Sequence, residues 1–267
     1  MKKILLTLML TLSLGAWAGN ENNSEEWTSW NRFLHSYSYH ARVGYNIGGT
    51  APLGMPASIR TLHSYSLRPN FSLGVDAWHP ISGKWGYQGG LLFENKGMKT
   101  DAGVKGYYMK IIRGGEQLQG LFTGSVVTKV DMSLITVPIL ATYDLSDKLR
   151  LKLGPYVSFV TNKKFEGWAY DGYLRCQDET MDKADPTGQK VMLGSEEGER
   201  GEYDFSDDMR SWLFGVKAGV DWYITKRWGV SADLAWGLNG IFKKDFTVIE
   251  QTMYPIFGTI GVIYQLK

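Results

Sequence analysis

Residues 211–238 alternate between apolar and polar side chains along two consecutive rows, and this alternation restricts the segment to β-structure. One apolar row begins at Trp212 and ends at Trp222, and the next begins at Trp228 and includes Trp236. A period of two is that of a β-strand. Tryptophan at both ends of an apolar row is typical of a strand that crosses a bilayer, because the ring prefers the boundary between lipid and water.

The length of the first row agrees with the thickness of a membrane. Ten residues extend about 33 Å along a strand, and a tilt of about 40° reduces this to about 25 Å, the height of the apolar band of a membrane barrel. Lys217 and Asp221 then lie at membrane depth. They must face the inside of the barrel, because a charge that faces lipid costs about 2–4 kcal/mol.

The same period recurs along the chain and predicts an all-β fold, a transmembrane antiparallel up-and-down β-barrel of about eight strands. The predicted strands are residues 37–48, 67–78, 85–94, 131–145, 148–160, 212–222, 228–238 and 254–266.

Short turns rich in Pro, Gly, Asp and Ser alternate with long connections, which we predict to be loops at residues 49–64, 97–129, 161–209 and 240–252. Transmembrane barrels have short periplasmic turns and long extracellular loops. A soluble eight-stranded barrel of the lipocalin type has the same period with its apolar side chains inside, and it remains the alternative architecture.

The first 18 residues have the composition of a secretory signal peptide. Two lysines precede the apolar run 4–14, and Ala16-Trp17-Ala18 matches a cleavage site. The run is shorter than the roughly 20 residues of a membrane-spanning helix. We therefore predict a cleaved signal peptide (1–18), a polar periplasmic leader (19–36) and a barrel (37–267) in the outer membrane of a Gram-negative bacterium.

The charge of the chain is close to balanced but unevenly distributed. The formal net charge is +2, and it falls to zero if Lys2 and Lys3 are removed with the signal peptide. A neutral chain argues against nucleic acid as a partner. Residues 161–210 hold thirteen acidic and seven basic residues. Cys176 is the single cysteine of the chain, so no disulfide framework is expected.

The interior of an eight-stranded barrel is only wide enough for side chains to fill it. In the hairpin that aligns Trp222 with Trp228, Lys217 faces Asp233, and we expect this pair within salt-bridge reach. Such a pair would be mainly architectural, because a buried charge without a partner is costly.

A second hairpin pairs Arg68 with Glu94 in the same way. We expect the inward charges to form one network that fills the lumen. Its predicted members are Arg68, Asp76, Glu94, Arg150, Lys152, Lys217, Asp221 and Asp233.

Aromatic residues form two further predicted groups. The first marks the membrane interfaces and comprises Trp78, Trp85, Trp212, Trp222, Trp228, Trp236 and Tyr264. The second lies in the acidic loop and comprises Trp168, Tyr170, Tyr173, Tyr203 and Phe205. Exposed aromatic side chains among charges suit recognition of a protein or a glycan, and a mobile shielding loop has the same composition.

Catalysis and metal binding have little support in the sequence. A lipid-modifying hydrolase or acyltransferase uses Ser, His and an acid, and among the four histidines only His40, near a strand end, is suitably placed. The histidines are too dispersed for a zinc site. Residues 178–185 lack the glycine and terminal Glu of a calcium-binding hand. We therefore expect no catalytic residues, no metal and no cofactor.

Three short motifs carry a family resemblance: Val137-Pro138-Ile139-Leu140, Leu153-Gly154-Pro155-Tyr156-Val157 and Gly237-Leu238-Asn239. On these motifs the chain resembles the PorT-like outer-membrane β-barrels of Bacteroidota, which are similar in plan to the eight-stranded OmpA-like barrels. The resemblance covers residues 37–267. It implies the fold and the outer membrane, and PorT itself is linked to protein secretion.

The expected function is that of a non-enzymatic outer-membrane scaffold that displays loops for binding or for envelope and secretion-related assembly. Its expected partners are outer-membrane lipid and envelope or secretion proteins, which would bind the loops or the leader. A lipid A deacylase or acyltransferase and a soluble periplasmic ligand-binding barrel are the alternatives.

Overall fold

The computed structural model describes residues 36–54, 56–177, 187–249 and 252–266, and Tyr39–Lys267 form one compact unit. The predicted signal peptide and all but the last residue of the predicted leader lie outside the described residues. The strands are β1 (Ser38–Pro52), β2 (Ile59–Leu67), β3 (Phe71–Ser82), β4 (Trp85–Arg113), β5 (Glu116–Ser146), β6 (Leu149–Cys176), β7 (Lys190–Leu193), β8 (Gly201–Asp204), β9 (Trp212–Tyr223), β10 (Trp228–Gly237) and β11 (Met253–Gln265), with one 3-10 turn, η1 (Ser206–Asp208). Among the described residues, no helix has the length and apolar character needed to cross a membrane.

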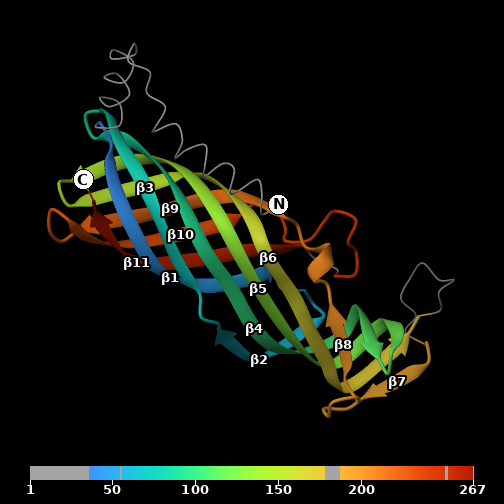
Figure 1. The fold of residues 1–267 in the computed structure, drawn as a ribbon. Helices are drawn as coiled ribbons and strands as arrows, with labels where there is room; N and C mark the ends of the chain where they lie inside the picture. The colour runs from blue at the N-terminus through green and yellow to red at the C-terminus, as the bar shows by residue number, and fades with distance from the viewer. Residues whose placement is uncertain (1–35, 55, 178–186, 250–251, 267) are drawn as a thin grey trace, which may run out of the picture. The chain divides into compact units, whose positions relative to one another are not determined.

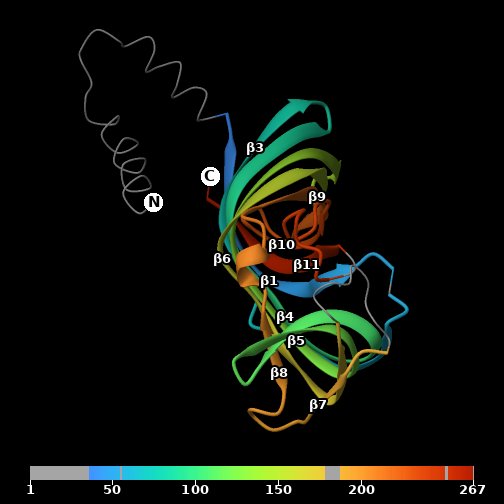
Figure 2. The ribbon, with the colours of Figure 1, turned by 90° about the vertical axis from the view of Figure 1, so that its right-hand side faces the viewer.

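Eight strands close into an antiparallel barrel. Around the barrel the order is β1, β3, β4, β5, β6, β9, β10 and β11, and β11 pairs back with β1. Figures 1 and 2 show these strands wound around one axis, with β4, β5 and β6 continuing past the others toward β7 and β8. This ring confirms the predicted up-and-down barrel of about eight strands.

The barrel is apolar outside and polar inside over most of its height. Ile139 and Leu153 point outward and are 63% and 58% exposed, whereas the inward-facing Lys152 and Asp221 are buried. A soluble barrel of the lipocalin type has the opposite distribution. The side chains therefore fit a barrel surrounded by lipid.

Strands β4, β5 and β6 are much longer than a bilayer requires, and their polarity reverses along their length. On β5 the buried row holds Phe122, Val126 and Val130 at one end, followed by Thr136 and Thr142 toward the other. The first three belong to an apolar cluster, whereas Thr136 bonds to the lumen network.

The outward row of β5 reverses at the same place. Lys129 and Asp131 precede Ile135, Val137 and Ile139 on this row. The part of the sheet beyond the apolar band has a polar outer face and an apolar core inside, as the sheet of a soluble protein has. This part, called the extension below, comprises β2, residues 97–113 of β4, 116–133 of β5 and 161–176 of β6, with β7 and β8.

Three of the predicted long loops are therefore largely sheet. Residues 97–129, predicted as one loop, form the continuation of β4 and β5 around a tight turn. Residues 161–209 contain the end of β6 with β7 and β8, and residues 49–64 contain the end of β1 and most of β2. The predicted strands ended where the outward row ceased to be apolar. In the structure the strands continue beyond this point, with polar side chains on the outer face and apolar side chains on the inner face. Only 240–252 has no strand in its described part.

The β9–β10 register differs by two residues from the prediction. Trp222 lies opposite Val230 instead of Trp228, which pairs with Tyr264 of β11. The amide N–H groups of Ile224 and Thr225 both donate to the carbonyl oxygen of Trp228. The turn therefore closes later than predicted, and each residue of β9 pairs with the residue two positions further along β10.

Candidate functional site

An ion network fills the barrel lumen and joins neighbouring strands as well as strands that are not adjacent in the sheet. Arg42 on β1 donates from Nη1 and Nη2 to the carboxylate of Asp221 on β9 at 3.0 and 2.7 Å, and from Nε to Asp76 on β3. Lys152 Nζ on β6 lies 2.6 Å from Asp221 Oδ1 and 2.8 Å from Asp233 Oδ1 on β10. Asp76, Lys152 and Asp221 are buried, and Arg42 and Asp233 are at most 10% exposed, so each charge depends on the others for its compensation.

A second part of the network lies around Glu94 on β4. Its Oε2 accepts a bond from Lys96 Nζ at 3.0 Å and one from the Thr136 hydroxyl at 2.7 Å. Lys217 Nζ lies 3.5 Å from Asp233 Oδ2, which agrees with the predicted pair. Because the register is shifted, the two residues meet diagonally and not directly opposite each other.

Arg150 forms a third part, near the short turns. Its guanidinium donates to both carboxylate oxygens of Asp144, at 2.6 and 3.1 Å, and lies 3.7 Å from the ring centre of Trp78. Trp78 Nε1 donates to Thr142 Oγ1. The prediction that Trp78 marks a membrane interface is wrong, because it shares the inward row of β3 with Asp76.

The predicted Arg68–Glu94 pair is also wrong. β3 begins at Phe71, and Ser72 is the residue that faces Glu94. Arg68 lies beyond the strand, and its Nε is 3.1 Å from Asp131 Oδ1 at the base of the extension. The structure therefore brings seven of the eight predicted network residues into the lumen and leaves Arg68 outside.

Sequence reasoning missed four acidic or basic members of the network, one of which is Asp144 on β5, the partner of Arg150. His40 and Arg42 occupy the inward row of β1, and the alternation with Ala41 and Val43 was a sufficient signal for both. Lys96 was missed because the predicted strand ended at residue 94.

The environment of His40 bears on the enzymatic alternative. Its Nδ1 lies 3.0 Å from Asp76 Oδ1 and its Nε2 lies 3.3 Å from the Tyr223 hydroxyl, and the imidazole is 2% exposed. A serine hydrolase places a serine hydroxyl where Tyr223 lies. The two contacts engage both ring nitrogens within the lumen network.

We expect His40→Ala to leave lipid A unchanged, because the imidazole is enclosed by Asp76 and Tyr223 and not by a nucleophile. Mass spectrometry of lipid A from cells that express either form would check this. A shift by the mass of one acyl chain in the variant would instead support a lipid-modifying enzyme.

Within the described parts of the chain, no group of three or more His, Cys, Asp or Glu residues is arranged to hold a metal ion. Residues 178–185, weighed above as a calcium loop, lie outside the described residues.

Most of the predicted interface aromatics project from the outer face of the barrel. Trp85, Trp212, Trp222, Trp228 and Trp236 are all exposed. Ring pairs across neighbouring strands accompany them: Trp85–Tyr143, Trp228–Tyr264 and Phe159–Trp212, with centroids 4.9, 4.7 and 5.0 Å apart. Their location at the lipid–water boundary stays a prediction.

The predicted recognition aromatics divide into two sets. Trp168 lies on the outer face of the extension with three cations over its ring: Lys129 at 4.7 Å, Arg200 at 4.8 Å and Lys99 at 5.7 Å. Such contacts fix the ring in place.

Tyr170 and Tyr173 belong with Trp168 at the surface. The Tyr170 hydroxyl donates to Asp101 Oδ2 at 2.8 Å, and Lys190 Nζ lies 4.6 Å from the Tyr173 ring centre.

Tyr203 and Phe205 are not exposed, which contradicts the prediction for these two residues. Their rings stack 5.3 Å apart in the apolar core of the extension, next to Phe165. The Tyr203 hydroxyl donates to the carbonyl oxygen of Val127, and burial raises the pKa of this phenol. Alternation along β8 places Tyr203 inward, and Phe205, the residue after the end of β8, continues the same row.

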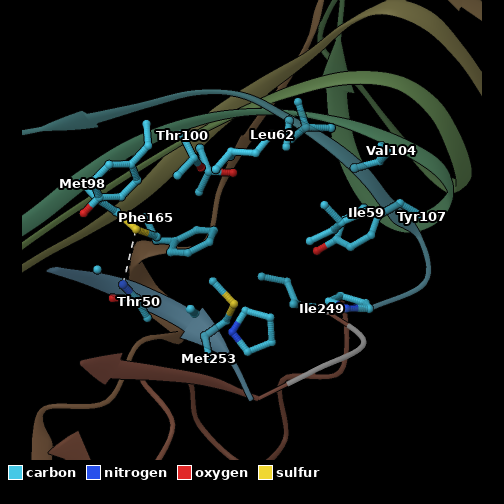
Figure 3. A pocket seen from close by; sticks show the side chains of 18 of the residues that line it. Thr50, Ile59, Leu62, Met98, Thr100, Val104, Tyr107, Phe165, Ile249 and Met253 are labelled. Atoms are coloured by element: carbon cyan, nitrogen blue, oxygen red, sulfur yellow. Dashed lines mark hydrogen bonds between the residues drawn. The ribbon is translucent and has the colours of Figure 1, made fainter. Parts of the chain in front are cut away.

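An apolar pocket of about 450 Å³ adjoins this core and was not anticipated from the sequence. Figure 3 shows side chains around an open centre. They come from the end of β1, from β2, from the extension parts of β4, β5 and β6, and from residues 248–256: Thr50, Ile59, Leu62, Met98, Thr100, Val104, Tyr107, Phe165, Ile249 and Met253 are among them. No sequence motif marks such a site, because its lining comes from many separate segments.

A comparison with known protein families agrees with this architecture. The family model described as "Outer membrane protein beta-barrel domain" matches residues 20–243. No curated protein matches the chain. Among solved structures, the chain is similar to Ail, the attachment invasion locus protein of Yersinia pestis, in complex with the heparin analogue sucrose octasulfate, with 11% identity, 86% of this chain and 99% of that chain covered, and a TM-score of 0.37.

The translocator domain of the autotransporter NalP from Neisseria meningitidis is 13% identical, with 90% of this chain and 95% of that chain covered and a TM-score of 0.25. These values are too low to transfer a function to this chain.

Proposed function

Because the chain belongs to the outer membrane protein beta-barrel domain family, we propose that it is a non-enzymatic outer-membrane scaffold whose barrel holds the extension outside the membrane for binding. The observation that carries this proposal is the reversal of polarity along β4, β5 and β6. A strand that only crosses a bilayer has no need of the additional residues. An apolar core beneath a polar outer face makes the extension a folded platform.

Because side chains fill its lumen, the barrel is better suited to be a scaffold than a channel. Arg42, Lys152 and Asp221 connect β1, β6 and β9 through the barrel interior. An eight-stranded barrel leaves little room beyond such side chains. Fixed cross-lumen ion pairs keep the barrel rigid, which suits a support for a binding surface.

The proposed orientation follows that of other outer-membrane barrels, with short turns in the periplasm and the extension outside the cell. We further propose that the signal peptide is cleaved and that the leader (19–36) lies in the periplasm. The three motifs quoted above support a relation to the PorT-like proteins, and with it a role in envelope or secretion-related assembly.

The partner we propose is an envelope or secretion protein that binds the face around Trp168. This ring is held by Lys129, Arg200 and Lys99, and acidic groups adjoin the cations: Glu166 Oε1 lies 3.9 Å from Lys129 Nζ, and Glu202 Oε1 lies 3.0 Å from Arg200 Nη2. Tryptophan and arginine are both enriched in protein interfaces, and this face presents the two side by side.

Photo-crosslinking in native outer membranes tests this proposal. Trp168→benzoylphenylalanine is expected to yield a discrete protein adduct, whereas Leu153→benzoylphenylalanine, in the apolar band, should yield adducts with lipid alone. The adducts are read by gel mobility and mass spectrometry. Adducts with lipid alone at both positions would contradict a binding role for this face.

A further inference from the structure

The lining of the apolar pocket restricts the chemistry of what it can hold. Among the residues that the structure describes, its lining includes no Asp, Glu, Lys, Arg or His. An ionised group in such a site would lose its hydration without gaining a partner. The volume of about 450 Å³ lies within the range of small-molecule sites. The pocket therefore fits an uncharged, mainly apolar molecule.

One polar group in the lining has no partner. Thr50 is 2% exposed, and its backbone N–H donates to Met98 Sδ at 3.3 Å. Its side-chain hydroxyl makes no hydrogen bond. This oxygen is enclosed by protein atoms and does not face the open volume of the pocket, so a ligand would meet mainly apolar groups.

The rim and the walls of the pocket suit a flexible chain. Leu62 and Tyr65 of β2 contribute to the lining and are 57% and 43% exposed, which places the opening at β2. Met98, Met109 and Met253 contribute to the walls. Methionine side chains adapt to irregular apolar shapes.

We propose that the apolar pocket binds one uncharged alkyl chain, which is held by apolar contacts with the lining. Two sources share this chemistry: a chain of a membrane lipid and a free neutral amphiphile. The proposal does not depend on the surface around Trp168. A result that contradicts the proposed function therefore leaves this proposal unaffected, and the reverse is also true.

Methyl NMR of the protein in nanodiscs, labelled with [13C-methyl]methionine, tests the proposal with 1-dodecanol as the probe. Met98, Met109 and Met253 are expected to shift saturably, whereas Met192, 63% exposed on β7, should not. Ionised dodecanoate should bind at least about tenfold more weakly, because the lining offers no cation.

Two variants sharpen the test. Ala102→Phe fills the pocket and should abolish the shifts, while Ala141→Phe, the same change on the outward face of β5, should leave them intact. The comparison of 1-dodecanol with ionised dodecanoate decides the question if Ala102→Phe does not fold.

A spin-labelled phosphatidylcholine separates the two sources. If a membrane lipid chain occupies the pocket, a doxyl group near the end of its acyl chain broadens Met98, Met109 and Met253; if the occupant is a free molecule, these signals stay sharp and only dodecanol shifts them. The absence of any saturable shift with dodecanol, together with no broadening, would overturn the proposal.

Discussion

Replacing Lys152 by methionine is expected to lower the free energy of unfolding by about 3–5 kcal/mol, the usual cost of removing one partner from a buried ion pair. The Lys152 side chain is 1% exposed and lies within 3 Å of both Asp221 and Asp233. Methionine retains most of the volume of the lysine side chain but removes the positive charge that compensates the carboxylates of Asp221 and Asp233. Urea titration of the protein folded in vesicles, followed by tryptophan fluorescence, measures the loss.

Lys164→Met is the matched control. Lys164 Nζ lies 2.7 Å from Glu166 Oε2, at a distance similar to the Lys152 contacts, but its side chain is 51% exposed. Water screens exposed ion pairs, which therefore contribute little to stability, so this variant should unfold near the parent concentration of urea. Equal losses in the two variants would show that the lumen is hydrated and that its charges are not interdependent.

The membrane part of the barrel was predictable because lipid and lumen select opposite side chains. Leu151, Leu153 and Val157 alternate with Arg150 and Lys152, and a period of two with such contrast has one interpretation. The extension was not predictable by the same criterion. Lys129, Val130 and Asp131 alternate as well, but here the outward side chains are charged instead of apolar. The predicted strands were limited to the thickness of a bilayer and therefore ended too early.

The lumen network was partly predictable for a similar reason. Alternation assigns a side chain to a face, which was enough for Lys217 and Asp233. It does not show which residues meet across the lumen. Lys152 and Asp233 lie on β6 and β10, which are separated by β9, and reasoning restricted to hairpins could not bring them together.

The apolar pocket could not be predicted from the sequence, because its lining residues come together only in the tertiary structure. Its Thr50 and Met98 come from β1 and β4, which are separated in the sheet by β3, and the unbonded hydroxyl becomes visible only when all neighbours are in place.

Leu153→Arg is expected to destabilise the barrel by about 2–4 kcal/mol and to reduce its insertion into the outer membrane, because the charge would face lipid. Leu153 is 58% exposed on the outward face of β6, and it pairs with Ala218 of β9. The loss can be measured by urea titration in vesicles, and the insertion from the fraction of protein that keeps heat-modifiable gel mobility in outer-membrane preparations.

Asn162→Arg provides the comparison on the same strand. Asn162 is exposed on β6 where the extension begins, so the added guanidinium would face water. Surface substitutions of this kind usually change stability by no more than about 0.5 kcal/mol. If the two arginine variants lose the same stability, the outward face near Leu153 does not contact lipid and the boundary between barrel and extension is misplaced. A loss confined to Leu153→Arg places that boundary between residues 153 and 162, where the outward row of β6 changes from leucine and valine to asparagine and lysine.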